Sequence, residues 1–239
     1  MPLHDLCATY DRAYAHKGLM GTDLDGDYDR ATKECLLNFA APLAGKKLLD
    51  VGAGIGRLWD YVPANVYGYA FDPSLIGSRL ALDTHPDLTL SVSIGEYIPY
   101  PDAFFDVVIA ADALEHAASG EQTLCEIYRT IKPGGIFAAS LPVPHSLPKW
   151  GYNQFIRRRP DLRLLFKLAR IVLKRILLFG RPDFQPIDRD YSSAQWLTLI
   201  REAGFSISAR QLWPLPPRLP LVLLIKAIKE VGDHGASSV

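Results

Sequence analysis

Three glycines at alternate positions follow the short apolar segment 48–51. They are Gly52, Gly54 and Gly56, and glycine at such a point lets the backbone turn sharply and lets a ligand come close to it. Asp72 ends the next apolar segment, twenty positions after Gly52, and a carboxylate at about that offset suits hydrogen bonds to ribose hydroxyls. The spacing predicts a nucleotide-type site. It differs from the Gly-x-Gly-x-x-Gly of dinucleotide binders, which favours a ligand without a pyrophosphate to seat at a helix end.

Two simpler interpretations of these residues stay open at this point. The glycines could form an ordinary turn between a strand and a helix. Asp72 could merely cap the following helix, with Pro73 as the first helical residue. The choice depends on what the rest of the chain contains.

Short apolar segments alternate with helical patterns along the chain, as they do in a parallel sheet covered by helices on both faces. The first five expected strands are near-continuous apolar runs, typical of strands buried on both faces: 47–51, 66–71, 88–94, 105–110 and 135–141. Two final strands, 205–212 and 221–228, are joined by a Pro-rich segment too short for a crossover helix, so we expect them to be antiparallel. The predicted fold class is α/β: a Rossmann-like, doubly wound, seven-stranded sheet, mostly parallel with an antiparallel last strand.

Two helices carry clear sequence signals. The first has apolar residues at helical spacing and ends where Pro133-Gly134-Gly135 would stop it; its apolar residues are Leu124, Ile127, Tyr128 and Ile131. The second is expected over Ser193–Ala203, because Ser192 and Gln195 form a capping-box pattern and Gly204 stands where a left-handed C-terminal residue belongs.

The composition is that of a globular protein: 239 residues, 49% hydrophobic and 22% charged, with a formal net charge of zero. A neutral chain does not favour a general polyanion-binding role. The three cysteines are far apart and show neither a zinc pattern nor a disulfide framework, and the histidines give no metal cluster. Neither a signal-peptide pattern nor a membrane-spanning apolar stretch is found, so we expect a cytoplasmic protein.

Several motifs, in order from about residue 45 to about residue 228, resemble those of one enzyme family, the class I S-adenosylmethionine (SAM)-dependent methyltransferases. The chain is most similar to methyltransferases of type 11 and of ubiquinone biosynthesis. The segments that carry the resemblance are Leu48–Leu58, the first motif; 97–108, similar to the run LPF-PD-x-x-FD-V-V; Leu114-Glu115-His116, similar to LEH; Ile131–Gly135, similar to LKPGG; and Glu202–Phe205.

The resemblance implies SAM as the cofactor and assigns its contacts. Its methionine part would lie along Asp50 and the glycines, and Asp72 would hold the ribose. Many relatives carry an acidic residue where this chain has Ile94, so adenine recognition would fall to backbone groups of Gly95 and Glu96, with Ile94 or Phe71 packing on the ring. The full expected cofactor site is Asp50, Gly52, Ala53, Gly54, Gly56, Asp72, Pro73, Gly95, Glu96 and Asp112.

Methyl transfer from a sulfonium is an in-line displacement, which needs alignment of the reacting atoms and exclusion of water. Asp112 follows the fourth strand and is expected to face the transferred methyl, where it could stabilise the amino group of the cofactor or orient an acceptor. His116 stands four positions later, so the two would share a helix face. An oxygen acceptor gains from a base, for which His116 and His145 are candidates, the alternative for each being a structural histidine. Glu115 is expected to be a charge at a helix start.

Residues 157–181 contain nine lysines and arginines and one acidic residue. Arg163, Lys167, Arg170 and Lys174 fall on one face of a helix whose other positions are mostly apolar. Such a helix predicts either contact with an anionic membrane surface or a lid that packs its apolar side on the core. The arginines could also hold an acidic or phosphorylated acceptor. Ubiquinone-biosynthesis O-methyltransferases resemble this chain in placing a membrane-touching insertion after the fifth strand.

We therefore expect N-terminal helices at 1–45 that cover the cofactor site, and a methyltransferase domain at 46–239 with a basic lid insertion at 144–190. The expected reaction is methylation of a small-molecule or lipid-like acceptor through oxygen. The alternatives are a nicotinamide-dependent oxidoreductase, a nucleic-acid methyltransferase and a membrane-associated scaffold without turnover. The glycine spacing disfavours the first, the aliphatic residues among the arginines disfavour the second, and the complete set of glycines and aspartates disfavours the third.

Overall fold

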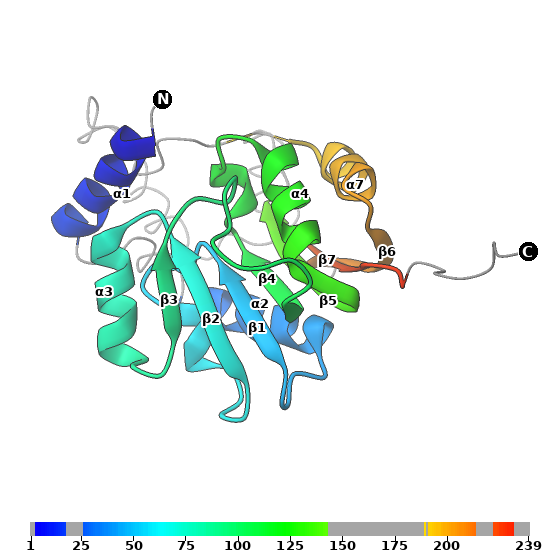
Figure 1. The fold of residues 1–239 in the computed structure, drawn as a ribbon, viewed down its shortest axis with the longest axis horizontal. Helices are drawn as coiled ribbons and strands as arrows, with labels where there is room; N and C mark the ends of the chain where they lie inside the picture. The colour runs from blue at the N-terminus through cyan, green and yellow to red at the C-terminus, as the bar shows by residue number, and fades with distance from the viewer. Residues whose placement is uncertain (1–2, 18–25, 143–188, 190, 214–221, 232–239) are drawn as a thin grey trace, which may run out of the picture.

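A computed structural model describes residues 3–17, 26–142, 189, 191–213 and 222–231. Seven strands form one sheet in the order β3-β2-β1-β4-β5-β7-β6, with helices packed around it (Figure 1). The strands are β1 (Lys47–Val51), β2 (Tyr67–Asp72), β3 (Thr89–Val92), β4 (Phe105–Ala111), β5 (Ile131–Pro142), β6 (Ser206–Trp213) and β7 (Val222–Ile228).

The pairing of the strands confirms the predicted fold class. β1 pairs in parallel with β2 and β4, β2 with β3, and β4 with β5. β7 lies between β5 and β6 and is antiparallel to both. The carboxyl ends of β1, β2, β4 and β5 therefore meet at one edge of the sheet, where ligands bind in doubly wound folds.

The central strands bury both of their faces, which is why their sequences are continuously apolar. In β1, Leu49 and Val51 belong to one hydrophobic cluster, whereas Leu48 belongs to the other. Val108 and Val107 divide in the same way in β4, following the period of two along a strand. The sheet is thus the middle layer of three.

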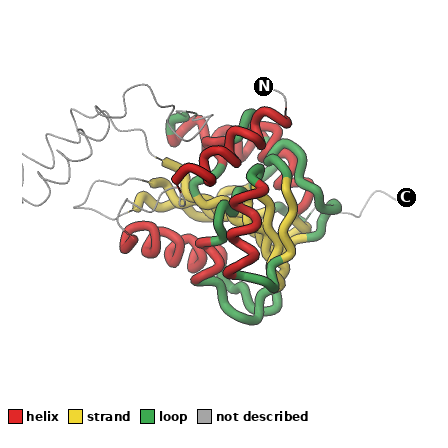
Figure 2. The backbone as a smooth tube through the Cα atoms, turned by 90° about the vertical axis from the view of Figure 1, so that its left-hand side faces the viewer, coloured by secondary structure: helices red, strands yellow, loops and turns green. Residues whose placement is uncertain are grey.

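Helices cover the two faces of the sheet (Figure 2). The helices are α1 (Leu3–Lys17), α2 (Gly26–Ala40), α3 (Leu75–Thr84), α4 (Gly120–Thr130) and α7 (Ser193–Glu202), with short 3₁₀ helices η1 (Arg57–Asp60) and η2 (Leu114–His116). Residues of α4 and α7, such as Leu124 and Trp196, are buried in the cluster on one face. Leu36 of α2 is buried in the cluster on the other. α3 packs along β2 and β3. α7 has the predicted capping box, and Gly204 after it has φ +100°.

The predicted end of the helix before the fifth strand is wrong. α4 ends at Thr130, and Ile131 is extended and pairs with Phe105 as the first residue of β5. Pro133-Gly134-Gly135 does not separate a helix from a strand but lies within β5, where the register shifts before Ile136 pairs with Val107. Ile131 is apolar because it is buried in the core from the strand.

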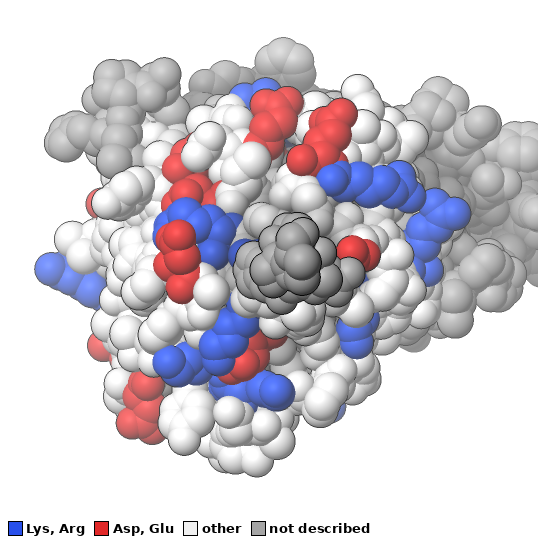
Figure 3. Space-filling model, turned by 45° about the vertical axis from the view of Figure 1, so that its right-hand side comes forward, with Lys and Arg blue, Asp and Glu red and all other residues white. Residues whose placement is uncertain are grey.

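Arg129 near the end of α4 fixes the loop that precedes β4. Its guanidinium donates to both carboxylate oxygens of Glu126, each at 2.8 Å, and to the carbonyl oxygens of Ile98 and Tyr100, each at 2.9 Å. It also donates to the Asp102 carboxylate at 2.7 Å. Arg129 therefore joins α4 to three residues of this loop, Ile98, Tyr100 and Asp102. On the face of the molecule that Figure 3 shows, cationic and anionic side chains of the described residues are interspersed.

The two helices expected within residues 1–45 are present as α1 and α2, and α1 packs on α3. The division of the chain at residue 45 stays a prediction. Apart from Arg189, the insertion expected at 144–190 lies outside the described residues, as does the basic segment 157–181 within it. In the described part of the chain, no helix combines the length and the apolar character needed to cross a membrane.

Candidate active site

The glycine loop after β1 is held against the tip of β2. Gly52, Gly54 and Gly56 have φ angles of +70°, +56° and +83°, a region that other residues adopt only with strain. The backbone N–H groups of Gly52 and Ala53 donate to the carbonyl oxygen of Phe71 at 3.0 and 3.1 Å. A side chain at Gly54 would also meet the Tyr14 hydroxyl, since an added Cβ would lie 2.7 Å from that oxygen. These glycines therefore meet a conformational requirement, as the sequence predicted.

Asp72 joins the glycine loop to the start of α3. Its Oδ2 accepts from the Gly54 N–H and its Oδ1 from the Ser74 N–H, each at 2.8 Å. Burial raises the pKa of Asp72 to about 6, and the two N–H donors oppose this rise. The interpretation of Asp72 as a cap with Pro73 as first helical residue is wrong, because Ser74 caps α3 and the helix begins at Leu75.

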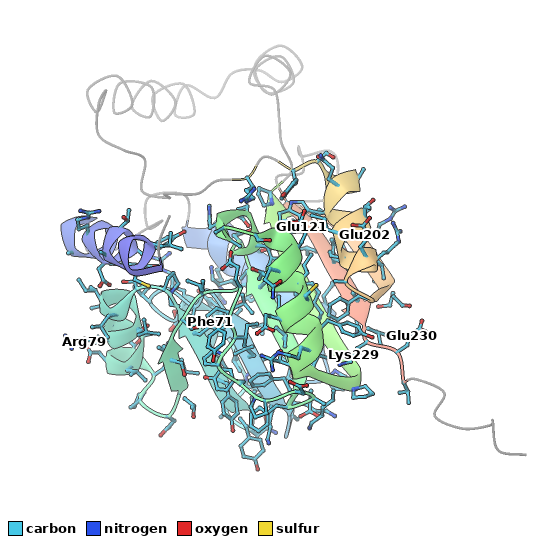
Figure 4. The ribbon with its side chains drawn as sticks, turned by 45° about the horizontal axis from the view of Figure 1, so that its top comes forward. Phe71, Arg79, Glu121, Glu202, Lys229 and Glu230 are labelled. Atoms are coloured by element: carbon cyan, nitrogen blue, oxygen red, sulfur yellow. The ribbon has the colours of Figure 1, made fainter. Side chains whose placement is uncertain are left out.

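A cavity of about 460 Å³ lies beside this loop, at the carboxyl edge of the sheet. Phe71, near the carboxyl end of β2, is one of the residues that line it; Figure 4 labels this residue on the sheet. The structure brings together at the cavity wall most residues of the expected site: Asp50, Gly52, Ala53, Gly54, Asp72, Pro73, Ile94, Gly95, Glu96, Asp112 and His116. Residues far apart in sequence thus share one cavity.

One described residue of the expected site, Gly56, is not on this wall. Gly56 faces α3 instead, where an added Cβ would lie 3.1 Å from the Cβ of Ala81 and 3.0 Å from the ring of His85. Its positive φ serves the entry into η1, for which it is the N-cap. The expectation that Gly56 lies along the methionine stays a prediction. His145 lies outside the described residues.

Helix α1 closes one side of the cavity. The sequence predicted N-terminal helices over the cofactor site but did not identify which of their residues line it. Leu6, Tyr10 and Tyr14 line the wall. The Tyr10 hydroxyl donates to the carbonyl oxygen of His116 at 3.3 Å. The Asp11 carboxylate accepts from the Ser74 hydroxyl at 2.6 Å and from the Ile76 N–H at 3.0 Å, which binds α1 to the start of α3. Burial raises the pKa of both tyrosines well above the usual value, so both remain neutral phenols.

Asp50 and Lys33 bring a carboxyl group and an ammonium group to the cavity. Asp50 is buried at the end of β1, and Lys33 reaches the wall from α2. Burial raises the pKa of Asp50 to about 7, and the positive charge of Lys33 opposes that rise. The sequence analysis missed Lys33 as a residue of the cavity wall. No local sequence pattern shows that a lysine in α2 lies beside the glycine loop that follows β1.

Asp112 and His116 lie on the same cavity wall but do not share a helix face. Asp112 has φ +50°, and η2 is only a single 3₁₀ turn over residues 114–116, so the predicted α-helical spacing is wrong. His116 Nε2 lies 3.8 Å from Glu115 Oε1. Glu115 lies in the first turn of η2, which begins at Leu114, but it is buried and not a surface charge.

The wall expected to contact adenine is built by Ile94, Gly95 and Glu96. Gly95 lies so close to α4 that an added Cβ would be 2.6 Å from the Thr123 methyl group. Glu96 accepts from the Ser119 N–H at 2.6 Å, at the start of α4. The carboxylate of Glu96 thus fixes the loop to the helix. Among the described residues, no group of His, Cys, Asp or Glu side chains could hold a metal ion.

Comparison with known proteins points to one family. The family model of the methyltransferase domain matches residues 49–139. Dimethylglycine N-methyltransferase of Parasynechococcus marenigrum is 32% identical over 143 residues, which cover 55% of this chain and 51% of that protein. Ubiquinone/menaquinone biosynthesis C-methyltransferase of Laribacter hongkongensis is 29% identical over 140 residues, which cover 55% of this chain and 54% of that protein. The chain thus spans about half the length of these relatives.

Solved structures with a similar fold include methyltransferases. The structure of 1,6-didemethyltoxoflavin-N1-methyltransferase from Burkholderia thailandensis, solved with S-adenosylhomocysteine, superposes with a TM-score of 0.64 and 18% identity, covering 97% of this chain and 92% of that one. At this identity the likeness is one of fold. Residues 49–139 thus match a methyltransferase domain, and the curated relatives and the glycine loop facing Asp72 agree with the resemblance of the chain to class I SAM-dependent methyltransferases.

Proposed function

We propose that this protein transfers the methyl group of SAM to a small-molecule acceptor. The observation that carries the proposal is the hydrogen bond between the Gly54 N–H and the Asp72 carboxylate at the cavity wall. It places a side-chain-free backbone segment beside a buried carboxylate, which suits an adenosine ribose next to a thioether or sulfonium.

Different residues of the cavity wall contact different parts of the cofactor. Asp72 receives the ribose hydroxyls, and Gly52 and Gly54, which have no Cβ, lie along the methionine. The adenine lies against Ile94 and the backbone of Gly95 and Glu96. Lys33 supplies the positive charge that a methionine carboxylate requires. When bound, SAM supplies an electrophilic methyl group on a positively charged sulfur.

The acceptor enters at the side formed by α1 and η2. Tyr10 covers that side and holds the backbone of His116, which limits the access of water. We propose that His116 accepts the proton of the acceptor's hydroxyl group, so that methylation occurs on oxygen. A small-molecule acceptor is in keeping with the substrates that the relatives' names give, dimethylglycine and quinones, although those enzymes are named for N- and C-methylation.

Two experiments test this function. Calorimetry with SAM, S-adenosylhomocysteine and NAD should give binding of the first two and none of NAD; binding of NAD alone would support the oxidoreductase alternative instead. Incubation with methyl-labelled SAM and pools of hydroxylated, amine-bearing and carbon-nucleophile metabolites, with and without lipid extracts, should label a hydroxylated compound. Labelling of amines or carbon alone would overturn the oxygen assignment while leaving methyl transfer intact.

The His116 role has its own test. With an accepted hydroxyl substrate, His116→Gln should lower kcat about 10²- to 10⁴-fold, the usual contribution of a general base, and leave the Kd of S-adenosylhomocysteine unchanged. An unchanged kcat would assign His116 a structural role. The cytoplasmic location and the membrane contact of residues 157–181 stay predictions.

A further inference from the structure

The segment between η2 and α4 forms the part of the cavity wall that carries His116. Residues 116–118 line the cavity. The last hydrogen bond of η2 and the first of α4 are accepted by the carbonyl oxygens of Leu114 and Ser119. The carbonyl oxygens of residues 115–118, between them, are therefore left for donors from elsewhere in the chain, because a backbone acceptor without a helical partner needs another one.

Two residues that are remote in the sequence supply these donors. Arg189 donates to three of the four carbonyl oxygens, through its backbone N–H, its Nε and its Nη2. The acceptors are, in that order, the carbonyl oxygens of Glu115 at 2.9 Å, Ala117 at 3.1 Å and Ala118. The Tyr10 hydroxyl donates to the fourth, that of His116, at 3.3 Å. Arg189 thus makes most of the contacts that fix the backbone of this wall segment.

The part of the chain next to Arg189 is anchored on the helix that the wall segment leads into. Tyr191, two positions later, meets the fully buried ring of Trp196 edge to face, with the ring centroids 4.8 Å apart. Both rings lie close to the first residue of α4, since an added Cβ at Gly120 would lie 3.4 Å from Trp196 and 3.7 Å from Tyr191. α7, which contains Trp196, packs beside α4 (Figure 1). The guanidinium of Arg189 therefore reaches the wall segment from a well-packed base.

We propose that Arg189 is a positioning residue of the active site: its hydrogen bonds set the backbone of residues 115–118 and thereby the place of the His116 imidazole at the cavity wall. The inference rests on the proposed function, in which His116 accepts the proton of the acceptor. Arginine suits this task, because its planar fork of N–H groups donates to two neighbouring carbonyl oxygens at once, whereas the ammonium group of lysine is a single point of contact. A misplacement of about 1 Å can lower the rate of a reaction about 10²-fold.

The test measures methyl transfer from methyl-labelled SAM to a pool of hydroxylated metabolites, at saturating SAM and per folded protein. Arg189→Ala should lower the rate about 10- to 100-fold. Arg189→Lys keeps the positive charge but not the fork, so its rate should lie between those of Arg189→Ala and wild type, and it serves alone if the alanine variant does not fold. Both variants should bind S-adenosylhomocysteine within about twofold of wild type by calorimetry, because the proposed cofactor contacts belong to other residues. Arg201→Ala, which changes an exposed arginine of α7, is the matched control and should alter neither quantity.

A double-mutant cycle separates positioning of His116 from a general structural role. In the His116→Gln background, Arg189→Ala or Arg189→Lys should not lower the rate further, because the group that Arg189 places is gone; a general structural role would lower the rate by the same factor in both backgrounds. A wild-type rate in the Arg189 variants, the same loss in both backgrounds, or a weakened affinity for S-adenosylhomocysteine would each overturn the inference alone. A His116→Gln variant as active as wild type, or a wild-type protein that labels no hydroxylated compound, would overturn the proposed role of His116 and this inference with it.

Discussion

Replacing Gly54 by alanine should damage the cofactor site more than the fold. Gly54 has φ +56°, and the left-handed conformation costs an L-residue about 1–2 kcal/mol. For a domain of this size that loss corresponds to a melting temperature lowered by about 2–8 °C. The added methyl group would also lie 2.7 Å from the Tyr14 hydroxyl, on the cavity wall.

The effect on the ligand is separate from the strain. Either Tyr14 or the methyl group must move into space that the cofactor would occupy, and overpacking of this kind costs about 1–3 kcal/mol. We therefore expect the Kd of S-adenosylhomocysteine to weaken about 5- to 150-fold, measured by calorimetry.

Gly45 supplies the matched control. It has φ +70°, and nothing lies within 4 Å of an added Cβ. Gly45→Ala should therefore show the same loss of stability and bind S-adenosylhomocysteine like wild type. If Gly54→Ala also bound the ligand with wild-type affinity and lost no more stability than Gly45→Ala, the assignment of this loop to the cofactor would be refuted.

Three further predictions follow from the charged groups. The pKa of Asp50 is raised to about 7, so between about pH 4 and pH 7 the folded protein keeps a proton on Asp50 that the unfolded chain has released. The free energy of unfolding should therefore fall as the pH rises from 4 to 7, by at most about 1.4 kcal/mol per pH unit. Urea titrations between pH 4 and 8 should show a smaller fall for Asp50→Asn, and equal slopes would contradict the raised pKa. Arg129→Lys loses the two-pronged contact with Glu126 and should lower the melting temperature by about 2–4 °C for a loss of about 1 kcal/mol, whereas Arg79→Lys on the exposed face of α3 should not. Asp11→Asn weakens the attachment of α1 to α3 and should speed dissociation of S-adenosylhomocysteine in stopped-flow measurements; a rate equal to wild type would show that α1 does not retain the ligand.

The fold was predictable because its signals are local. β1 matches its predicted bounds, and the predicted antiparallel final pair followed from the length of a loop alone. The error at Ile131 arose because an apolar residue buried in a strand can continue the spacing of the helix before it. Pro133-Gly134-Gly135 then resembled a stop signal, although β5 absorbs it as a register shift.

The site was predictable only where one motif contains it. Asp50, Gly52 and Gly54 stand together in the sequence, and Asp72 follows at a spacing set by the parallel pairing of β1 and β2. Tyr10, Tyr14 and Lys33 reach the cavity from helices that precede the sheet, so only tertiary packing reveals them. Tyr10 and Tyr14 stand four positions apart, a spacing that places both on one helix face and could have marked that face as buried.

The order of the strands explains why the cavity has its floor between β1 and β4. After β1 the chain leads to β2 and β3 on one side, and after β4 to β5 on the other, so the segments that leave these two strands diverge and open a crevice. At the floor of the crevice the segments nearly touch, since a Cβ at Gly52 would lie 2.9 Å from that of Ala113. A larger residue at either position would push the glycine loop away from Asp112. Gly52 and Ala113 are therefore a matched pair, and their small size keeps the loop and the carboxylate close enough to bind one ligand together.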